Sequence, residues 1–382
     1  MSYHFEDVHR DIQELARRFS RERLAPRYME RERTETVVDR ELLREMGSLG
    51  LIAPEIPEEL GGLGLTPVAS GIIAEEVGYG DFNIGYLPVL GALMASVLAQ
   101  FARPDVARTW VPRITGGEAI VAIALTEPRG GSDAANLILS ARRCEGGYRL
   151  NGEKTSISLA DQADGFVVFA RTGDPKSRAK GVSAFMVPAD SPGISRTRFD
   201  DLGSHVLGRG SIFFDDVFIP EDHLLGVEGG GFVQIMEGFD YSRALLGLLC
   251  IGAAQASLDE SWAYIEQREA FGQKLSAFQG VTFPLAEGET AMEAARQLCL
   301  HTLRLKSEGL PHTAEAAMCK WLGPKASVDV IHQCLLTHGH YGWSKDMPHQ
   351  QRMRDVMGIE IGDGTAQIMK MIIARTRASQ SR

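Results

Sequence analysis

The sequence has few cysteines, and none of them forms a close pair. Its 382 residues include five cysteines, an odd number, with no CxxC spacing among them. A disulfide framework or a structural zinc site normally shows closely spaced cysteine pairs. We therefore predict buried thiols in a reducing compartment and no metal centre. The five are Cys144, Cys250, Cys299, Cys319 and Cys334.

Excess positive charge and a long apolar run are also missing. The chain has 40 Lys and Arg against 50 Asp and Glu, a formal net charge of −10. Nucleic acids and anionic membranes attract basic surfaces, so neither is an expected partner. The main apolar run, residues 244–256, contains glycines and Gln255 and is too short to cross a bilayer. The first residues, MSYHFEDVHRDIQELARRF, mix acidic residues with a helical period, which predicts a folded cytoplasmic protein rather than a targeting peptide.

Common nucleotide and nucleophile motifs are absent as well. We find no GxGxxG, Walker A or GxSxG pattern. Ser177 and Lys180 complete an SxxK pattern, but it lies in a polar turn without its partner motifs, which favours coincidence. His338 and His340 flank Gly339, yet no third ligand follows at a suitable spacing, so a glycine turn is favoured over a metal pair.

The hydrophobic period changes twice along the chain and predicts three domains. Residues 1–118 read as helices, with Thr66 and Pro67 as a helix start. Residues 119–228 contain short β-branched or aromatic runs such as GFVVFAR and GVSAFMVP, separated by turns, which predicts a β domain. Residues 229–382 return to long helical patterns. This order predicts an α+β multidomain fold and excludes the βαβ alternation of a doubly wound sheet.

One acidic residue near the end of the chain is placed unusually. In IGDGTAQIMK, residues 361–370, Asp363 lies between two glycines ahead of an apolar helix. Glycines leave a carboxylate open to another molecule, which is typical of a base. Thr365 is a predicted helix cap, and the helix is expected to bury Ile368, Ile372 and Ile373. From this segment alone, an Asp-Gly turn that opens the last helix is the commoner alternative.

Four groups of segments, taken together and in order, resemble the acyl-CoA dehydrogenase family over nearly the whole chain. They are LTEPRGGSD (125–133), LNGEKTSIS (150–158), FDDVFIPEDHLLG (214–226) followed by FDYSR, and a last group of REAFGQKL (268–275), HGHYGW (338–343) and RDVMGIEIGDGTAQI (354–368). The resemblance implies an N-terminal α-helical domain, a middle β-barrel-like domain and a C-terminal four-helix bundle. It also implies FAD between the β domain and the bundle, an acyl-CoA substrate, electron-transfer flavoprotein as the acceptor, and a homo-oligomer, usually a tetramer.

The resemblance assigns the flavin half of FAD to two segments of the β domain. The first lines the ring and includes Thr126 as a hydrogen-bonding residue, with Ser132 also near the CoA pyrophosphate; Arg129 stands where glycine is usual. The second lies beside the ring, where an aromatic residue is often found; Ser156 replaces it and leaves room, and Ser158 keeps a hydroxyl. The implied contacts are Ile123, Leu125, Thr126, Gly131, Ser132, Ser156, Ile157 and Ser158.

The adenosine half of FAD is assigned to the helical segments of a neighbouring subunit. Arginine supplies a fixed fork of donors for pyrophosphate oxygens. Leu336 stands where the family commonly has glutamine, so one contact is expected to be lost. The implied residues are Arg268, Phe271, Phe278, Gln279, Leu336 and Gly339, together with Thr365 and Gln367. Substrate contacts are implied for Ser132, Asp240, Arg243 and Gly364, although an Asp and Arg three residues apart on a helix commonly form a surface salt bridge.

The resemblance also gives Asp363 a catalytic role. It aligns with the carboxylate, usually Glu, that removes the α-proton of a thioester while hydride leaves the β-carbon for flavin N5. Ser242 occupies the alternative base position of some branched-chain members and is not a carboxylate. Burial beside an apolar acyl chain should raise the pKa of Asp363 and strengthen it as a base.

The acyl group is expected to be wide. Asp is one methylene shorter than Glu, and Gly362 and Ser156 stand where bulkier residues are frequent. The GDGTAQIM segment resembles the subgroup that converts cyclohexanecarbonyl-CoA to cyclohex-1-ene-1-carbonyl-CoA. Two alternatives remain at this point: a flavin oxidase of the nitroalkane-oxidase type, which also uses an aspartate base, and a catalytically silent FAD-binding protein.

Overall fold

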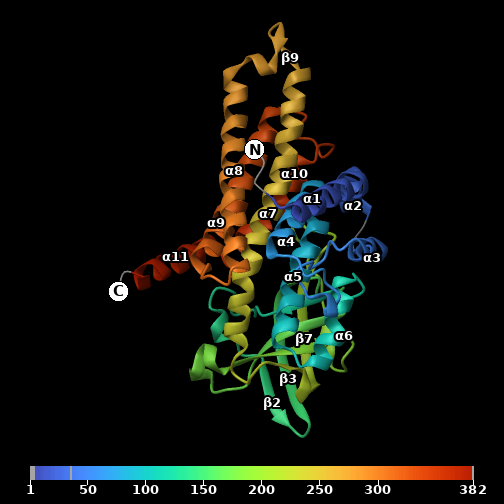
Figure 1. Ribbon diagram of the computed structural model, residues 1–382, viewed down its shortest axis with the longest axis vertical. Helices are drawn as coiled ribbons and strands as arrows, with labels where there is room; N and C mark the ends of the chain where they lie inside the picture. The colour runs from blue at the N-terminus through green and yellow to red at the C-terminus, as the bar shows by residue number, and fades with distance from the viewer. Residues whose placement is uncertain (1–4, 35–36, 381–382) are drawn as a thin grey trace.

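The computed structural model describes residues 5–34 and 37–380. Helices of the N-terminal part pack beside the middle of the molecule, strands gather at one end, and long C-terminal helices extend to the other end (Figure 1). This is the α+β architecture that the change of hydrophobic period predicts, with a helical domain on each side of a β domain in sequence.

The N-terminal domain consists of six α-helices: α1 (Asp7–Phe19), α2 (Tyr28–Thr34), α3 (Arg40–Ser48), α4 (Pro67–Gly80), α5 (Phe82–Phe101) and α6 (Pro104–Thr115). A π-helical turn (Ser20–Leu24) and a 3-10 turn (Ala25–Arg27) join α1 to α2, and Glu58–Leu60 forms a further 3-10 turn. Aspartates start two of these helices: Asp39 accepts the Glu41 and Leu42 N–H groups, and Asp81 accepts those of Asn83 and Ile84.

Helix α5 is more apolar than the sequence analysis recognised. It is long and hydrophobic enough to cross a membrane, and 83% of its apolar window is buried inside the protein. It packs against α4, α6 and α7 and therefore forms the centre of the core. Thus α5, not the shorter run at residues 244–256, is the principal apolar segment.

The middle domain is a mixed sheet. Its strands are β1 (Val121–Ala124), β2 (Ser140–Cys144), β3 (Gly147–Ser158), β4 (Gly165–Arg171), β5 (Val182–Pro188), β6 (Ile194–Arg196), β7 (Arg209–Pro220) and β8 (Leu224–Leu225), with short 3-10 turns at Ala134–Asn136, Pro175–Gly181 and Glu221–His223. The order is β6-β7-β3-β2-β4-β5-β8, and β1 pairs with β4 in parallel. Strand β4 is buried throughout, which explains its continuous apolar sequence.

The C-terminal domain is a bundle of long helices. It contains α7 (Gly231–Gln267), α8 (Gln279–Ser307), α9 (Thr313–Thr337), α10 (His349–Ile361) and α11 (Ala366–Gln380). A small hairpin of β9 (Glu269–Ala270) and β10 (Gln273–Lys274), followed by a 3-10 turn at Leu275–Ala277, joins α7 to α8 at the end of the molecule opposite the β domain (Figure 1). Helix α7 packs against α4, α5, α8 and α9 and so connects both helical domains.

Candidate active site

Asp363 lies in the tight turn between α10 and α11. Its φ angle is +53° and that of Gly364 is +102°, so both adopt backbone conformations that L-residues avoid. Such strain in a non-glycine residue is commonly found at functional sites. The Thr365 hydroxyl accepts the Ile368 N–H at a long 3.5 Å, so the predicted cap is weak.

The apolar stripe predicted after this turn is partly wrong. Ile368, Ile372 and Ile373 are only half-buried, and Met369 is the buried side chain instead. The Met369 side chain packs directly against the turn. A Cβ atom added at Gly364 would lie only 2.5 Å from Met369 Cε, so methionine, rather than one of the isoleucines, fills the space beside the turn.

A small cavity lies against the Asp363 side chain. Helix α5, strand β1 and helix α7 all contribute to it, so the three domains meet at this point. Most of its wall is aliphatic, and its polar groups are two hydroxyls and one carboxylate. The lining residues are Tyr86, Val89, Leu90, Leu93, Ile123, Ser242, Leu246 and Asp363. Gly362 and Ser156, which the sequence analysis expected to enlarge the site, are not among them.

Burial dominates the electrostatics of this cavity. It raises the pKa of Asp363 above its ordinary value, and the nearby cations Lys320 and Arg243 partly offset this rise. The pKa of Tyr86 is raised as well. Desolvation by burial is the larger cause, and the negative charge of Asp363 is the second. The Tyr86 hydroxyl interacts with the side chain of Ser158, one of the predicted flavin contacts. Asp363 thus faces a neutral phenol and two buried cations.

Arg243 and Asp240 form a pair that is more buried than a surface salt bridge. Arg243 Nη1 lies 3.0 Å from Asp240 Oδ1, and the arginine side chain is only 4% exposed. Thr313 also donates a hydrogen bond to Asp240 Oδ2 over 2.5 Å. In the described part of the chain, Arg243 Nε and the adjacent Ser242 Oγ have no hydrogen-bond partner. Buried polar atoms of this kind are normally satisfied, so these two fit a site that receives a polar ligand.

A buried ion pair supports the predicted flavin loop, residues 123–132. Lys154 of β3 donates to Glu127 Oε1 and to the Leu125 carbonyl, each at 2.9 Å. Glu127 also accepts the backbone N–H groups of Ile138 and Leu139, at 2.7 and 2.8 Å. Above this pair, Arg129, Gly131 and Ser132 are exposed, while Thr126 is half-buried. The anchor therefore fixes the base of the loop and leaves its outer part open to a ligand.

The second predicted flavin segment contains a β-bulge. The register between β3 and β7 shifts between Lys154 and Ile157, and Ser156 has a φ angle of +58°. Ser156 Oγ lies 3.3 Å from Arg209 Nη1 and accepts its hydrogen bond. Ile157 is buried in the domain core, whereas Ser158 is half-buried beside Tyr86.

The structure separates the two groups of predicted FAD contacts. The flavin segments belong to the β domain at one end, whereas Arg268, Phe271 and Gln279 belong to the β9–β10 region at the other (Figure 1). Phe271 is 97% exposed and touches Phe278, with ring centroids 6.2 Å apart. The remaining predicted contacts on the helical side, Leu336, Gly339 and Gln367, are exposed, while Thr365 is half-buried. One chain therefore does not bring both groups together.

Sequence reasoning missed two residues beside Asp363. Lys320 is a single lysine within the apolar sequence AAMCKWLG of α9, a signal that could have identified it as a buried cation. Tyr86 gave no such signal, because an aromatic residue in an apolar helix is normally core. Only the fold shows that Tyr86 borders the cavity next to the carboxylate.

A carboxylate of raised pKa on an apolar cavity, where a β domain meets a helical bundle, is typical of an enzyme that removes a proton beside an apolar group. Models of the N-terminal, middle and C-terminal domains of acyl-CoA dehydrogenases match residues 6–118, 122–217 and 229–377. The chain belongs to the acyl-CoA dehydrogenase family.

Known relatives agree with this assignment. The chain is 34% identical over 370 residues to the mitochondrial short-chain specific acyl-CoA dehydrogenase of Rattus norvegicus, covering 96% of this chain and 89% of the relative. It is 32% identical to the benzylmalonyl-CoA dehydrogenase of Aromatoleum aromaticum, covering 99% and 100%. The solved butyryl-CoA dehydrogenase of Megasphaera elsdenii superposes with a TM-score of 0.95 at 29% identity, covering 99% and 100%.

FAD is the cofactor of this family, and the residues present fit it. Ser158 places a hydroxyl beside Tyr86 of α5, which lines the cavity together with Ile123 of β1, and Thr126 follows β1 in the chain. Ser242 Oγ and Arg243 Nε, which have no hydrogen-bond partner in the described part of the chain, belong to α7. This combination of an apolar wall with hydroxyl donors suits a flat ring with polar edges.

Proposed function

We propose that this acyl-CoA dehydrogenase oxidises an uncharged, compact and wide acyl thioester, either cyclic or α-branched, with Asp363 as the base for the α-proton. Cyclohexanecarbonyl-CoA, giving cyclohex-1-ene-1-carbonyl-CoA, is the substrate that we favour. The observation that carries the proposal is the short carboxylate of Asp363 on a cavity whose walls are otherwise mostly aliphatic.

The position of Asp363 supports its role as the base. Burial raises its pKa, and a carboxylate with a raised pKa holds an abstracted proton more tightly. FAD, when bound, supplies the hydride acceptor, so that the α-hydrogen leaves as a proton, the β-hydrogen leaves as a hydride, and a Cα=Cβ double bond forms. The flanking Gly362 and Gly364 add no side-chain bulk around the carboxylate.

The cavity walls support a compact acyl group. Val89, Leu90 and Leu93 of α5 line the same small cavity as Asp363, and this apolar lining favours a compact acyl group over a long straight chain. Asp363 reaches one methylene less far than Glu would, so the substrate α-carbon must come closer to the turn. A ring or a branch at the α-carbon brings apolar surface to these walls without extending along the helix.

The charges around the cavity support an uncharged acyl group. Benzylmalonyl-CoA, named for one relative, carries a free carboxylate, which needs a cation when it is buried. Here the charge of the nearby Arg243 is paired with Asp240 through Nη1, although its Nε has no partner in the described part of the chain, and Lys320 is bound to backbone carbonyls. Neither cation lines the cavity.

We further propose a homotetramer, with electron-transfer flavoprotein as the acceptor and the cytoplasm as the location. The separation of the two FAD contact groups within one chain supports completion of each site by a second copy.

Anaerobic bleaching of the flavin absorption tests the substrate. The panel is cyclohexanecarbonyl-CoA, isobutyryl-CoA, butyryl-CoA, octanoyl-CoA and glutaryl-CoA. We expect the fastest bleaching with the first two and little with glutaryl-CoA. A preference for octanoyl-CoA or glutaryl-CoA would refute the proposed acyl group, and rapid peroxide formation from nitroethane would indicate an oxidase instead.

The Asp363→Asn variant tests the base. It keeps the size of the side chain but removes its basicity, so we expect FAD to remain bound and bleaching to slow by roughly 1,000-fold or more. Asp329→Asn on the exposed face of α9 is the matched control and should bleach at the wild-type rate. Wild-type bleaching by Asp363→Asn would remove Asp363 from the reaction.

A further inference from the structure

A buried lysine holds the turn that carries Asp363. Lys320, in the middle of α9, is 1% exposed. Its Nζ donates to the carbonyl of Ile359 at 2.5 Å and to the carbonyl of Gly364 at 3.1 Å. One ammonium therefore joins the end of α10 to the residue that follows Asp363.

The surroundings of Lys320 do not include an ion-pair partner. In the described part of the chain, no carboxylate lies within salt-bridge distance of its Nζ, although a buried ammonium is costly without one. The charged and titratable groups that face it are Asp363, Glu360 of α10, and Cys250 and Arg243 of α7. Burial lowers the pKa of Lys320, and Asp363 is the strongest influence in the other direction. A methionine would fill this place at lower cost if packing were its only role.

The contact with Ile359 has a consequence for the backbone of Asp363. In a continuing α-helix, the Ile359 carbonyl would accept the N–H of Asp363, four residues later. The last such bond instead joins the Gly362 N–H to the Gly358 carbonyl, at 3.0 Å. The next carbonyl, that of Ile359, accepts a hydrogen bond from Lys320 Nζ instead. Within the described residues, the N–H of Asp363 forms no hydrogen bond. That N–H is therefore available to a ligand.

We propose that Lys320 is a positioning residue for the dehydrogenation, which fixes the Asp363 carboxylate and keeps the Asp363 N–H free to bind the thioester oxygen as negative charge develops there. A lysine satisfies the Ile359 carbonyl without using the Asp363 donor. Its second bond, to Gly364, holds the strained turn from the other side. The inference rests on the proposed role of Asp363 as the base.

The test compares Lys320→Met with Lys325→Met. Both variants replace a lysine of α9 by methionine, but Lys325 is exposed and pairs with Asp329. We expect Lys320→Met to bind FAD and to bleach roughly 10- to 100-fold more slowly, mainly in kcat, because the base and the donor are misplaced. Amide hydrogen exchange of a peptide spanning residues 359–368 should accelerate in Lys320→Met alone.

The pH dependence of bleaching separates positioning from a general loss of stability. Removing the ammonium removes the main group that opposes the raised pKa of Asp363, leaving Arg243 as the other. The rising limb of the pH–rate profile should therefore move to higher pH, a change that packing alone would not cause. A wild-type rate, pH profile and exchange rate in Lys320→Met would overturn the proposal.

Lys320→Gln carries the test if Lys320→Met does not fold. Its amide can reach one carbonyl but has no charge, so we expect an intermediate rate and the same displacement of the pH profile. A wild-type rate and profile in Lys320→Gln would equally overturn the proposal. If Asp363→Asn abolishes bleaching while the Lys320 variants do not slow it, only the role of Lys320 fails; if Asp363→Asn bleaches normally, the proposed function fails first.

Discussion

At the scale of single residues, the length of the proposed base, Asp363, should determine where the substrate lies. The Asp363 turn is fixed on both sides, by the end of α10 and by Lys320, and its backbone has little freedom to compensate for a different side chain. A methylene added at this position would place the carboxylate further from the backbone of the turn, in a cavity that Val89 and Leu90 also line. Side-chain length and acyl shape are thus coupled here.

The Asp363→Glu variant should change selectivity more than it changes folding. We expect kcat/KM for cyclohexanecarbonyl-CoA to fall by about 10-fold or more, because a misplacement near 1 Å disrupts the attack geometry. The ratio of kcat/KM for butyryl-CoA to that for the cyclic thioester should rise. Steady-state kinetics with both thioesters measure this ratio, and Asp329→Glu on α9 serves as the control. An unchanged ratio would contradict the coupling between base length and acyl shape.

At the scale of elements, the flavin loop depends on a buried ion pair beneath it. Burial lowers the pKa of Lys154 to about 8, and Glu127 partly restores it. Both side chains are almost fully buried. Because Glu127 also holds two backbone N–H groups, the pair links the loop to the start of β2.

The Lys154→Met variant should weaken FAD binding and stability together. It leaves the Glu127 carboxylate buried without its cation, which costs roughly 3–5 kcal/mol in comparable cases. We expect a lower thermal midpoint and a higher FAD dissociation constant by flavin fluorescence. The double variant Glu127→Gln, Lys154→Met removes the stranded charge and should recover part of the thermal midpoint. If the single variant binds FAD as tightly as wild type, the pair does not support the loop.

Much of this arrangement of elements could be predicted from the sequence. The change from helical patterns to short β-branched or aromatic runs separated by turns indicated the β domain, and the mostly apolar GFVVFAR run matches the buried strand β4. The bulge at Ser156 and the buried pair of Glu127 and Lys154 could not be predicted, because both depend on which strands become neighbours. The position of Tyr86 at the site could not be predicted either, because its helix has the sequence of a core helix and only the fold brings it next to Asp363.

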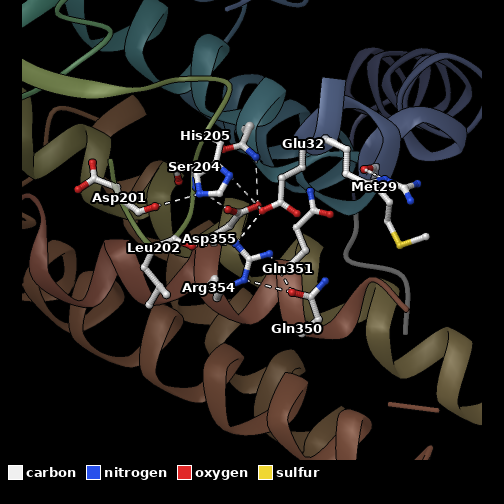
Figure 2. Close-up of polar contacts among 12 residues, drawn as sticks. Met29, Glu32, Asp201, Leu202, Ser204, His205, Gln350, Gln351, Arg354 and Asp355 are labelled. Carbon is white, nitrogen blue, oxygen red and sulfur yellow. Dashed lines mark hydrogen bonds and ion pairs between the residues drawn. The ribbon is translucent and has the colours of Figure 1, made fainter. Parts of the chain in front are cut away.

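At the scale of the whole molecule, Asp355 links the three domains. Its carboxylate accepts hydrogen bonds from Tyr28 at 2.8 Å and Asn83 at 3.0 Å in the N-terminal domain, and from the Ser204 N–H at 2.6 Å in the β domain. Figure 2 shows Glu32 of α2 near Asp355. Glu32 points toward Arg354, which lies next to Asp355 in α10, and toward His205 of the β domain. Asp355 and Arg354 belong to α10, the helix that leads to the Asp363 turn.

Asp355 should also make the stability of the protein depend on pH. Burial raises its pKa to about 7 from 3.8. The folded protein therefore binds this proton more tightly than the unfolded chain does. The resulting stabilisation is fully present below the unfolded pKa and is lost as the pH rises through about 7.

The Asp355→Asn variant isolates this contribution. Its amide cannot titrate, and its NH₂ group must face one of the three donors, which should cost about 1–3 kcal/mol. We expect the urea midpoint of the FAD-bound variant to lie below that of wild type at every pH. The gap should be widest near pH 5 and should narrow toward pH 8, because only wild type loses its bound proton over this interval. Asp81, whose pKa burial raises to about 6, titrates in both proteins, and its negative charge also helps to raise the pKa of Asp355, so the two titrations are coupled. A gap that stays constant or widens with pH would show that Asp355 is already ionised at pH 5, and that its three donors outweigh the cost of burying its charge.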